Sequence, residues 1–161
     1  MNTPTSRPDM RLLLQALQSE SASEDGMDNV LNPEQWDALA PYLLPLSLPT
    51  GHVLFRQGEL DRTLYLVESG SLSVHFEDEK ARLRLAMVSA GSIVGEGGFF
   101  SHRPRNATVQ TSAPCVLWSL TAMRFTELAN RQPSVALQVT MAAGAVLARR
   151  LSNRRRRIAA T

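Results

Sequence analysis

The chain has 161 residues, of which 43% are hydrophobic and 20% are charged. This length fits one ordinary domain, and this balance excludes a fibre, a disordered tail and a multidomain enzyme. The net charge of +2 hides a split, because residues 1–80 hold 13 acidic and 5 basic side chains whereas residues 81–161 hold 2 and 12. Such a split is compatible with a basic surface for an anion, a nucleic acid or a membrane, and also with two halves that fold together.

The single cysteine and the N-terminal residues favour a cytoplasmic location. Cys115 lies in an apolar run and has no partner for an intramolecular disulfide, which predicts a core position in a reducing compartment. The first residues lack the basic and then apolar pattern of a signal peptide. The longest uncharged run, 132–148, is short and contains polar residues, so it does not predict a membrane span.

The N-terminal third predicts helices. Residues 9–18 have apolar side chains at helical spacing, and residues 19–29 are acidic and polar, as is typical of a linker. A second helix is expected from Pro33 toward Tyr42, with Asn32 as its N-cap. We therefore expect residues 1–32 to form an N-terminal helix and linker, and residues 33–161 to form the main domain.

From Leu46 the pattern changes to short β-rich runs separated by turn residues. Alternation in two of them, 71–76 and 82–88, predicts strands with one buried and one exposed face. The expected strands are 46–48, 52–55, 63–67, 71–76, 82–88, 107–111 and 115–120. This spacing predicts a mainly β fold, an antiparallel β-roll or jelly roll over about 46–120.

The last quarter of the chain predicts helices again, over about 121–158. Thr121 is a plausible N-cap for a short helix, and Pro133 opens a longer one that we expect to reach Ile158. This long helix carries two apolar rows, which favours two partners: the β-roll and a second copy of the chain. The alternative is that the helix packs only on its own β-roll. One row consists of Leu137, Met141, Gly144, Leu147 or Ala148, and Leu151, with Ile158 two turns further on, and the other of Val135, Val139, Ala142 and Val146.

One segment carries residues suited to binding an anionic sugar, the run VGEGGFFSHRPRNATV at 94–109. Its three glycines free backbone N–H groups for close approach to a ligand, and Arg105 presents a rigid fork suited to phosphate oxygens. Glu96 can accept hydrogen bonds from ribose hydroxyls. On residue types alone, a glycine-rich turn with a salt bridge between Glu96 and Arg105 explains the segment equally well.

The order of these residues resembles the phosphate-binding cassette of the cyclic nucleotide-binding domain family. The matching residues are Val94-Gly95-Glu96 and, nine residues after the glutamate, Arg105 within Pro104-Arg105-Asn106-Ala107-Thr108. Residues 51–59 and 64–70 resemble the family too, and the likeness spans roughly 33–155. The family's Leu-Ala after the glutamate is Gly97-Gly98 here.

The resemblance implies roles for individual residues. Glu96 matches the glutamate that binds the ribose 2′-hydroxyl, and Arg105 matches the arginine that pairs with the cyclic phosphate. Asn106 replaces a smaller residue that differs between cAMP- and cGMP-binding relatives, so it leaves the base open. The backbone contributors that the resemblance implies are Gly95, Gly97, Gly98, Asn106 and Ala107.

The function that the resemblance implies is a regulatory module that senses cAMP or cGMP and signals through its C-terminal helix. We expect no catalytic residue, metal or further cofactor, since His52, His75 and His102 lack metal-ligand spacing. Expected partners are a second copy and an unknown effector protein. The alternative is an interaction scaffold with the same β-roll that has lost nucleotide binding.

The arginine run at 149–157 allows a further reading. It could bind nucleic acid or anionic lipid, or it could be a solvated helix end whose cations complement the helix dipole. We expect no sequence-specific DNA binding, because about ten residues follow Leu151 and a second recognition helix does not fit there.

Overall fold

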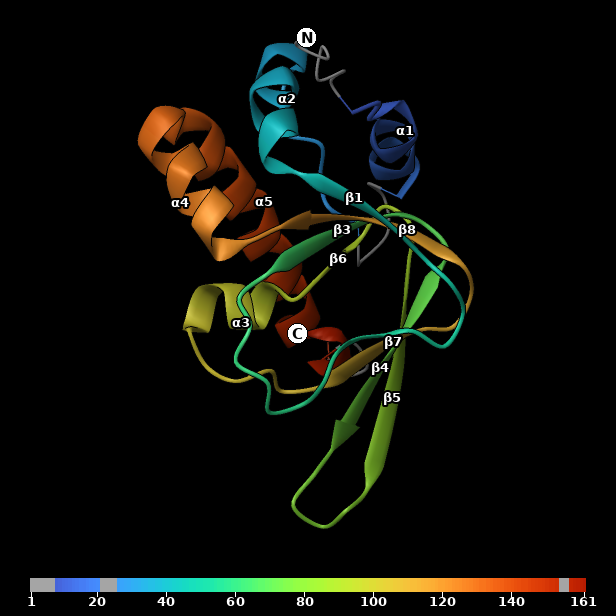
Figure 1. Cartoon of the computed structure of the whole chain (residues 1–161). Helices are drawn as coiled ribbons and strands as arrows, with labels where there is room; N and C mark the ends of the chain where they lie inside the picture. The colour runs from blue at the N-terminus through green and yellow to red at the C-terminus, as the bar shows by residue number, and fades with distance from the viewer. Residues whose placement is uncertain (1–7, 21–25, 154–156) are drawn as a thin grey trace, which may run out of the picture.

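The computed structural model describes residues 8–20, 26–153 and 157–161. Two antiparallel sheets form the body of the molecule, and helices gather against one of them (Figure 1). The strands are β1 (Leu44–Leu48), β2 (Val53–Phe55), β3 (Leu64–Ser69), β4 (Ser71–Glu77), β5 (Leu83–Ser89), β6 (Ile93–Val94), β7 (Thr108–Thr111) and β8 (Cys115–Leu120). The helices are α1 (Arg11–Glu20), α2 (Pro33–Leu39), α3 (Glu96–Ser101), α4 (Ala122–Arg131) and α5 (Pro133–Ser152), with short 3-10 helices η1 (Ala40–Tyr42) and η2 (Arg157–Ala159).

The strands pair into two sheets of four. One sheet has the order β1-β8-β3-β6, the other has the order β2-β7-β4-β5, and every pairing is antiparallel. The predicted fold class, an antiparallel β-roll with flanking helices and a long C-terminal helix, is confirmed. Within residues 8–20, 26–153 and 157–161, no helix is both long and apolar enough to cross a lipid bilayer.

Two hydrophobic cores share the first sheet. Leu64 and Leu66 of β3 pack with the helices, whereas Tyr65 and Val67, on the opposite face of the same strand, pack between the two sheets. A strand that is buried on both faces reads as a continuous apolar run, which explains the sequence Leu64–Val67. Cys115 is buried in the second core, as predicted.

The N-terminal elements are integrated into the fold. Asn32 caps α2 as predicted, because its side chain accepts a hydrogen bond from the Gln35 amide at 2.9 Å. The prediction of a linker over 19–29 is wrong for its last part: Met27 is buried, and Gly26 forms a β-bridge with Ser92. The part of that prediction at 21–25 lies outside the described residues.

In strand β5 the larger apolar side chains are exposed to solvent. Leu83, Leu85 and Met87 are exposed, and the smaller Ala86 and Val88 face the core. The alternation therefore predicts the strand itself. Its leucine-bearing face is the outer one, and the face that carries Ala86 and Val88 turns toward the core.

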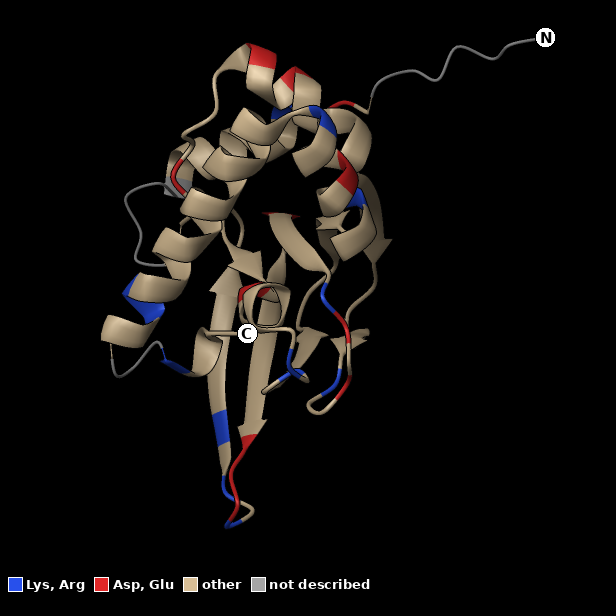
Figure 2. Ribbon diagram, turned by 90° about the vertical axis from the view of Figure 1, so that its left-hand side faces the viewer, with Lys and Arg blue, Asp and Glu red and all other residues tan. Residues whose placement is uncertain are grey.

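The long helix α5 ends at Ser152, earlier than the predicted Ile158. Ile158 lies in η2 and packs beside the core between the sheets, so it is not part of the apolar row of α5. Arg154, Arg155 and Arg156 lie outside the described residues. The chain after α5 thus turns back toward the β-roll, and the segment at 157–161 lies beside α3 (Figures 1 and 2).

Candidate functional site

The cassette begins with a sharp turn from β6 into α3. Gly95 has a φ of 88°, and a Cβ on it would lie 2.5 Å from the Thr63 carbonyl oxygen and 2.7 Å from Nη1 of Arg105. Only glycine fits both the backbone angle and the space. The turn places Glu96 in the first turn of α3, where a carboxylate is favoured by the helix dipole.

Arg105 crosses the base of the site with its side chain fully buried. Its Nη2 lies 2.6 Å from Oδ2 of Asp61 and donates to the Thr63 carbonyl, and its Nη1 donates to the Gly95 carbonyl. The guanidinium also lies 4.0 Å from the ring centroid of Phe55. Its buried Nε has no hydrogen-bond partner among the described residues. Arg105 is therefore held in position with one donor left unsatisfied.

Asp61 is the acidic partner of this arginine. Burial alone would raise the pKa of Asp61, but the hydrogen bonds from Arg105 and Thr63 and the charge of Arg105 outweigh it, so the pKa is lowered. Asp61 is consequently ionised at neutral pH. The ion pair fixes the orientation of the guanidinium before any ligand arrives.

Glu96 has a different partner, Arg150 near the end of α5. Oε1 of Glu96 lies 2.7 Å from Nη1 of Arg150, and both side chains have no exposed surface. Arg150 also donates to Ser92 Oγ and to the Ile93 and Ala159 carbonyls. The helix end and the cassette are thus joined by a buried ion pair, and Glu96 and Arg105 do not form the salt bridge with each other that was considered from the sequence.

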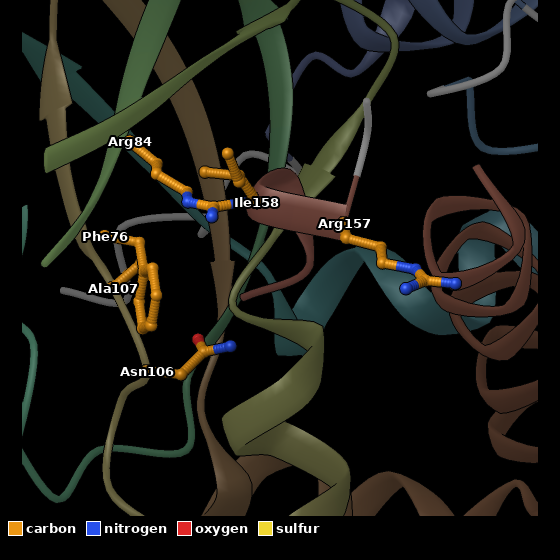
Figure 3. Close-up of a pocket in the computed structure, with 6 residues that line it drawn as sticks. All are labelled: Phe76, Arg84, Asn106, Ala107, Arg157 and Ile158. Carbon is orange, nitrogen blue, oxygen red and sulfur yellow. The ribbon is translucent and has the colours of Figure 1, made fainter. Parts of the chain in front are cut away.

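The described part of the C-terminal segment lies against the cassette. Thr161 hydrogen-bonds Glu96 through its amide and its hydroxyl, both at 3.1 Å, and Nδ2 of Asn106 donates to the Ala160 carbonyl. Beside them a pocket opens between β4, β5 and the start of β7 (Figure 3). It is lined by Phe76, Arg84, Asn106, Ala107, Arg157 and Ile158.

All seven residues predicted from the sequence are brought to this site. Gly95, Glu96, Gly97 and Gly98 form the turn and first half of α3, and Arg105, Asn106 and Ala107 lead into β7. Whether they bind a nucleotide stays a prediction. Three further participants, Asp61, Arg150 and Thr161, were not identified from the sequence. The sequence does indicate that Arg150 is buried, because it follows Val146 by four residues and so lies on the same buried face of α5.

The described members of the arginine run differ in their exposure and contacts. Arg150 is fully buried, and Arg149 pairs with Asp28 at 3.1 Å and donates to the Gly26 carbonyl. Arg157 is exposed and donates through Nε to the Leu151 carbonyl. The sequence suggests a basic surface or a helix end whose cations complement the dipole, and neither reading predicts that Arg150 is buried and that Arg149, 35% exposed, pairs with Asp28.

Comparison with known proteins gives consistent matches. The model of the family described as "Cyclic nucleotide-binding domain" matches residues 45–132. The cAMP-activated global transcriptional regulator CRP of Pasteurella multocida is 30% identical over 112 residues, covering 68% of this chain and 52% of that protein. The chain thus spans about half the length of the curated relatives it matches.

Solved structures agree on the fold. The catabolite activator protein of Thermus thermophilus has a TM-score of 0.66 at 30% identity, over 77% of this chain and 57% of that one. A cyclic nucleotide-binding domain from Methylobacillus flagellatus has a TM-score of 0.76 over 88% of this chain and 77% of that one. Its sequence identity is 20%, so it supports the fold alone.

Proposed function

Because the chain belongs to the cyclic nucleotide-binding domain family, we propose that it is a regulatory module that binds cAMP or cGMP and signals through α5. The observation that carries the proposal is Arg105, a buried cation held by Asp61 with its Nε unsatisfied at the cassette. A cyclic phosphate supplies the oxygen that this donor lacks. The cAMP-activated relative supports the same ligand class.

A route from ligand to helix supports the signalling half of the proposal. A ribose hydroxyl that donates to Glu96 meets a carboxylate already paired with Arg150 of α5. Binding therefore changes the surroundings of an arginine that also holds the Ala159 carbonyl. A regulatory module needs such a contact between its ligand and a movable element.

The exposed face of α5 supports a homodimer as the recipient of the signal. Val135, Val139 and Val146 are buried against the chain's own domain, whereas Leu137, Met141 and Leu151 on another face are exposed. An apolar row on a surface helix is typical of a protein–protein contact. We propose a second copy as the partner, with an effector protein as the other recipient.

One observation favours the alternative of an interaction scaffold that does not bind nucleotide. Both carboxylate oxygens of Glu96 are already hydrogen-bonded, to Arg150 and Thr161. A site filled permanently by its own chain would serve only as a structural element. Direct titration separates this alternative from the proposed sensor.

The test is isothermal titration calorimetry with cAMP and cGMP on the parent and on Arg105→Ala. Loss of a buried charge partner costs about 2–5 kcal/mol, so we expect affinity to fall roughly 30-fold or more. Arg103→Ala is the matched control, because it removes the same charge from an exposed position in the same loop and should bind as the parent does.

Circular dichroism is needed to show that Arg105→Ala folds, since the substitution leaves Asp61 without its partner. Arg105→Lys keeps the charge but loses the planar fork, and it should give an intermediate loss of affinity. A folded Arg105→Ala variant that binds cyclic nucleotide as tightly as the parent would contradict the assignment of this residue.

A further inference from the structure

Residues 158–161 lie where the cassette would receive its ligand. We infer that this segment is an internal ligand that occupies the nucleotide site and must leave before a cyclic nucleotide can enter. The inference rests on the proposed function and adds the regulation of that site. Figures 1 and 2 show the C-terminal end beside α3, far along the sequence from it but in contact.

The hydroxyl of Thr161 makes the contacts expected of a sugar hydroxyl. Its Oγ1 donates to Oε2 of Glu96 at 3.1 Å and accepts from the Gly95 amide at 2.8 Å. The Thr161 amide donates to the other oxygen of the same carboxylate. Thr161 has no exposed surface, so these bonds are made out of water. A ribose hydroxyl therefore competes with Thr161 for Glu96.

Backbone and side-chain groups of the cassette are used by the segment as well. The Gly98 amide donates to the main-chain oxygen of Thr161 at 3.1 Å, and Asn106 donates to the Ala160 carbonyl at 2.9 Å. Three of these donors, on Gly95, Gly98 and Asn106, belong to residues that the sequence assigns to nucleotide binding. The segment and a nucleotide thus draw on one set of groups.

Gly97 makes room for the segment. A Cβ at Gly97 would lie 2.9 Å from the carbonyl carbon of Thr161 and 3.0 Å from its oxygen, which is closer than real contacts allow. The cassettes that this segment resembles have a leucine at this position. The departure at Gly97 therefore has a physical consequence in this chain, because it creates the space in which Thr161 sits.

Apolar contacts hold the other end of the segment. Ala159 is fully buried in the core between the sheets, and Ile158 packs beside it. In Figure 3, Ile158 lies beside Arg84 at the wall of the pocket that Phe76 also lines, while Arg157 points away toward α5. Thr161 thus makes polar contacts of the kind that a sugar requires, and Ile158 makes apolar contacts of the kind that a nucleotide base requires.

The segment is also tied to α5 through Arg150, which binds both Glu96 and the Ala159 carbonyl. Release of residues 158–161 therefore removes a partner from the end of α5. If the docked form holds nine molecules in ten, the apparent affinity for nucleotide is about tenfold below the intrinsic one. Removing the segment recovers that factor.

The experiment compares the parent with a variant lacking residues 158–161, and with Thr161→Val and Thr161→Ser. Thr161→Val keeps the shape and removes both hydroxyl contacts, and Thr161→Ser restores them as the matched control. Amide hydrogen exchange at Gly95 and Gly98 measures docking without any nucleotide. Calorimetry with cAMP and cGMP then measures competition.

We expect both amides to be protected in the parent and in Thr161→Ser, and to exchange faster in Thr161→Val and in the shortened variant. The shortened variant should bind cyclic nucleotide more tightly than the parent, by about tenfold if the docked form holds nine molecules in ten. Equal exchange in all four proteins would show that the segment is not docked and would overturn the inference. Equal affinities despite different exchange would overturn the competition and leave the proposed function intact.

A shortened variant that is folded and binds neither nucleotide would overturn the proposed function itself, and the competition with it. If the Gly95 amide exchanges faster in that variant than in the parent, residues 158–161 still occupy the site in the parent. The scaffold alternative predicts this result. If the shortened variant does not fold, Thr161→Val still tests the inference, because this substitution leaves Ala159 in the core.

Discussion

Two buried arginines determine the properties of the site. Arg105 is held by Asp61, and Arg150 is held by Glu96, so each cation is neutralised by a carboxylate from a different element. Both members of the Glu96–Arg150 pair are fully buried, so removing one of them costs about 3–5 kcal/mol, because the other charge stays in the interior. The Asp61–Arg105 pair contributes less, because the Asp61 side chain is 35% exposed and solvent screens the pair. A substitution at any of these four positions therefore affects folding as well as binding.

The Asp61–Arg105 pair predicts a dependence of stability on pH. The pKa of Asp61 is lowered in the folded chain from its ordinary 3.8. A lowered pKa adds stability that is fully present above about pH 4 and is lost as pH falls through the folded value. Asp61→Asn lacks this contribution. We expect the variant to be less stable than the parent at pH 6, and the difference to narrow below pH 4.

Urea denaturation of both proteins at pH 6 and pH 3 measures this change. The pKa values of Asp9 and Asp78 are also lowered, but both residues are present in parent and variant, so the difference isolates Asp61. Because the Asp61 side chain is 35% exposed, solvent screens the pair and the effect is modest. A difference as large at pH 3 as at pH 6 would contradict the prediction.

The sequence identifies the two charged residues of the cassette but not their partners. Glu96 and Arg105 stand in one short motif, so order and spacing reveal them. Asp61 is 44 residues from Arg105, and Arg150 is 54 from Glu96, so only the fold brings them together. No local pattern distinguishes Asp61 from the other acidic residues of the N-terminal half.

At the scale of elements, the sheets are more predictable than the ends of the helices. Alternation and turn residues locate seven of the eight strands, and β6, with only two residues, is too short to give a pattern. The chain after α5 packs through Ile158 and Thr161 on residues that are distant in the sequence. A sequence window around the arginine run contains none of those partners.

Gly144 in the middle of α5 provides a test of the helix itself. A Cβ at this position meets nothing within 4 Å, and its φ is in the ordinary range. Gly144→Ala should therefore raise the free energy of unfolding by about 0.5–1 kcal/mol, because alanine loses less backbone entropy in a helix. Thermal or urea denaturation at low protein concentration measures it.

Gly70→Ala is the contrasting variant for the same assay. Gly70 has a φ of 89°, and a Cβ there would lie 2.3 Å from the Pro114 carbonyl oxygen. It should lower stability, because both the backbone angle and the space exclude a side chain. Equal effects of the two substitutions would show that the helix at Gly144 is packed differently from the structure described.

At the scale of the whole molecule, the segment at 157–161 connects parts that the chain order separates. It follows α5, packs beside the core between the sheets and reaches α3. The cassette, the segment at 157–161 and the long helix are therefore in contact through Glu96, Arg150 and Thr161. A change at the cassette reaches α5 by direct contact, as a regulatory module requires.

The outer face of α5 is the surface through which we propose that such a change reaches a second copy of the chain. Leu137 and Met141 are 58% and 63% exposed, and Leu151 is 51% exposed, on a helix whose other face is buried. Small residues between them allow a second helix to approach closely. In the proposed homodimer this face makes a self-complementary two-fold contact, in which each α5 packs on the other.

Met141→Glu tests that dimer. A carboxylate placed in the middle of an apolar contact loses its water without gaining a partner, so we expect the parent to sediment as a dimer at tens of micromolar and the variant as a monomer. Met123→Glu is the matched control, because Met123 is 79% exposed on α4 and is not part of the exposed apolar row of α5. With cAMP present, the parent's dissociation constant should change by a factor that corresponds to about 1–3 kcal/mol of coupling. A parent that stays monomeric with and without cAMP, or a Met141→Glu variant that dimerises as the parent does, would exclude this face of α5 as the dimer contact.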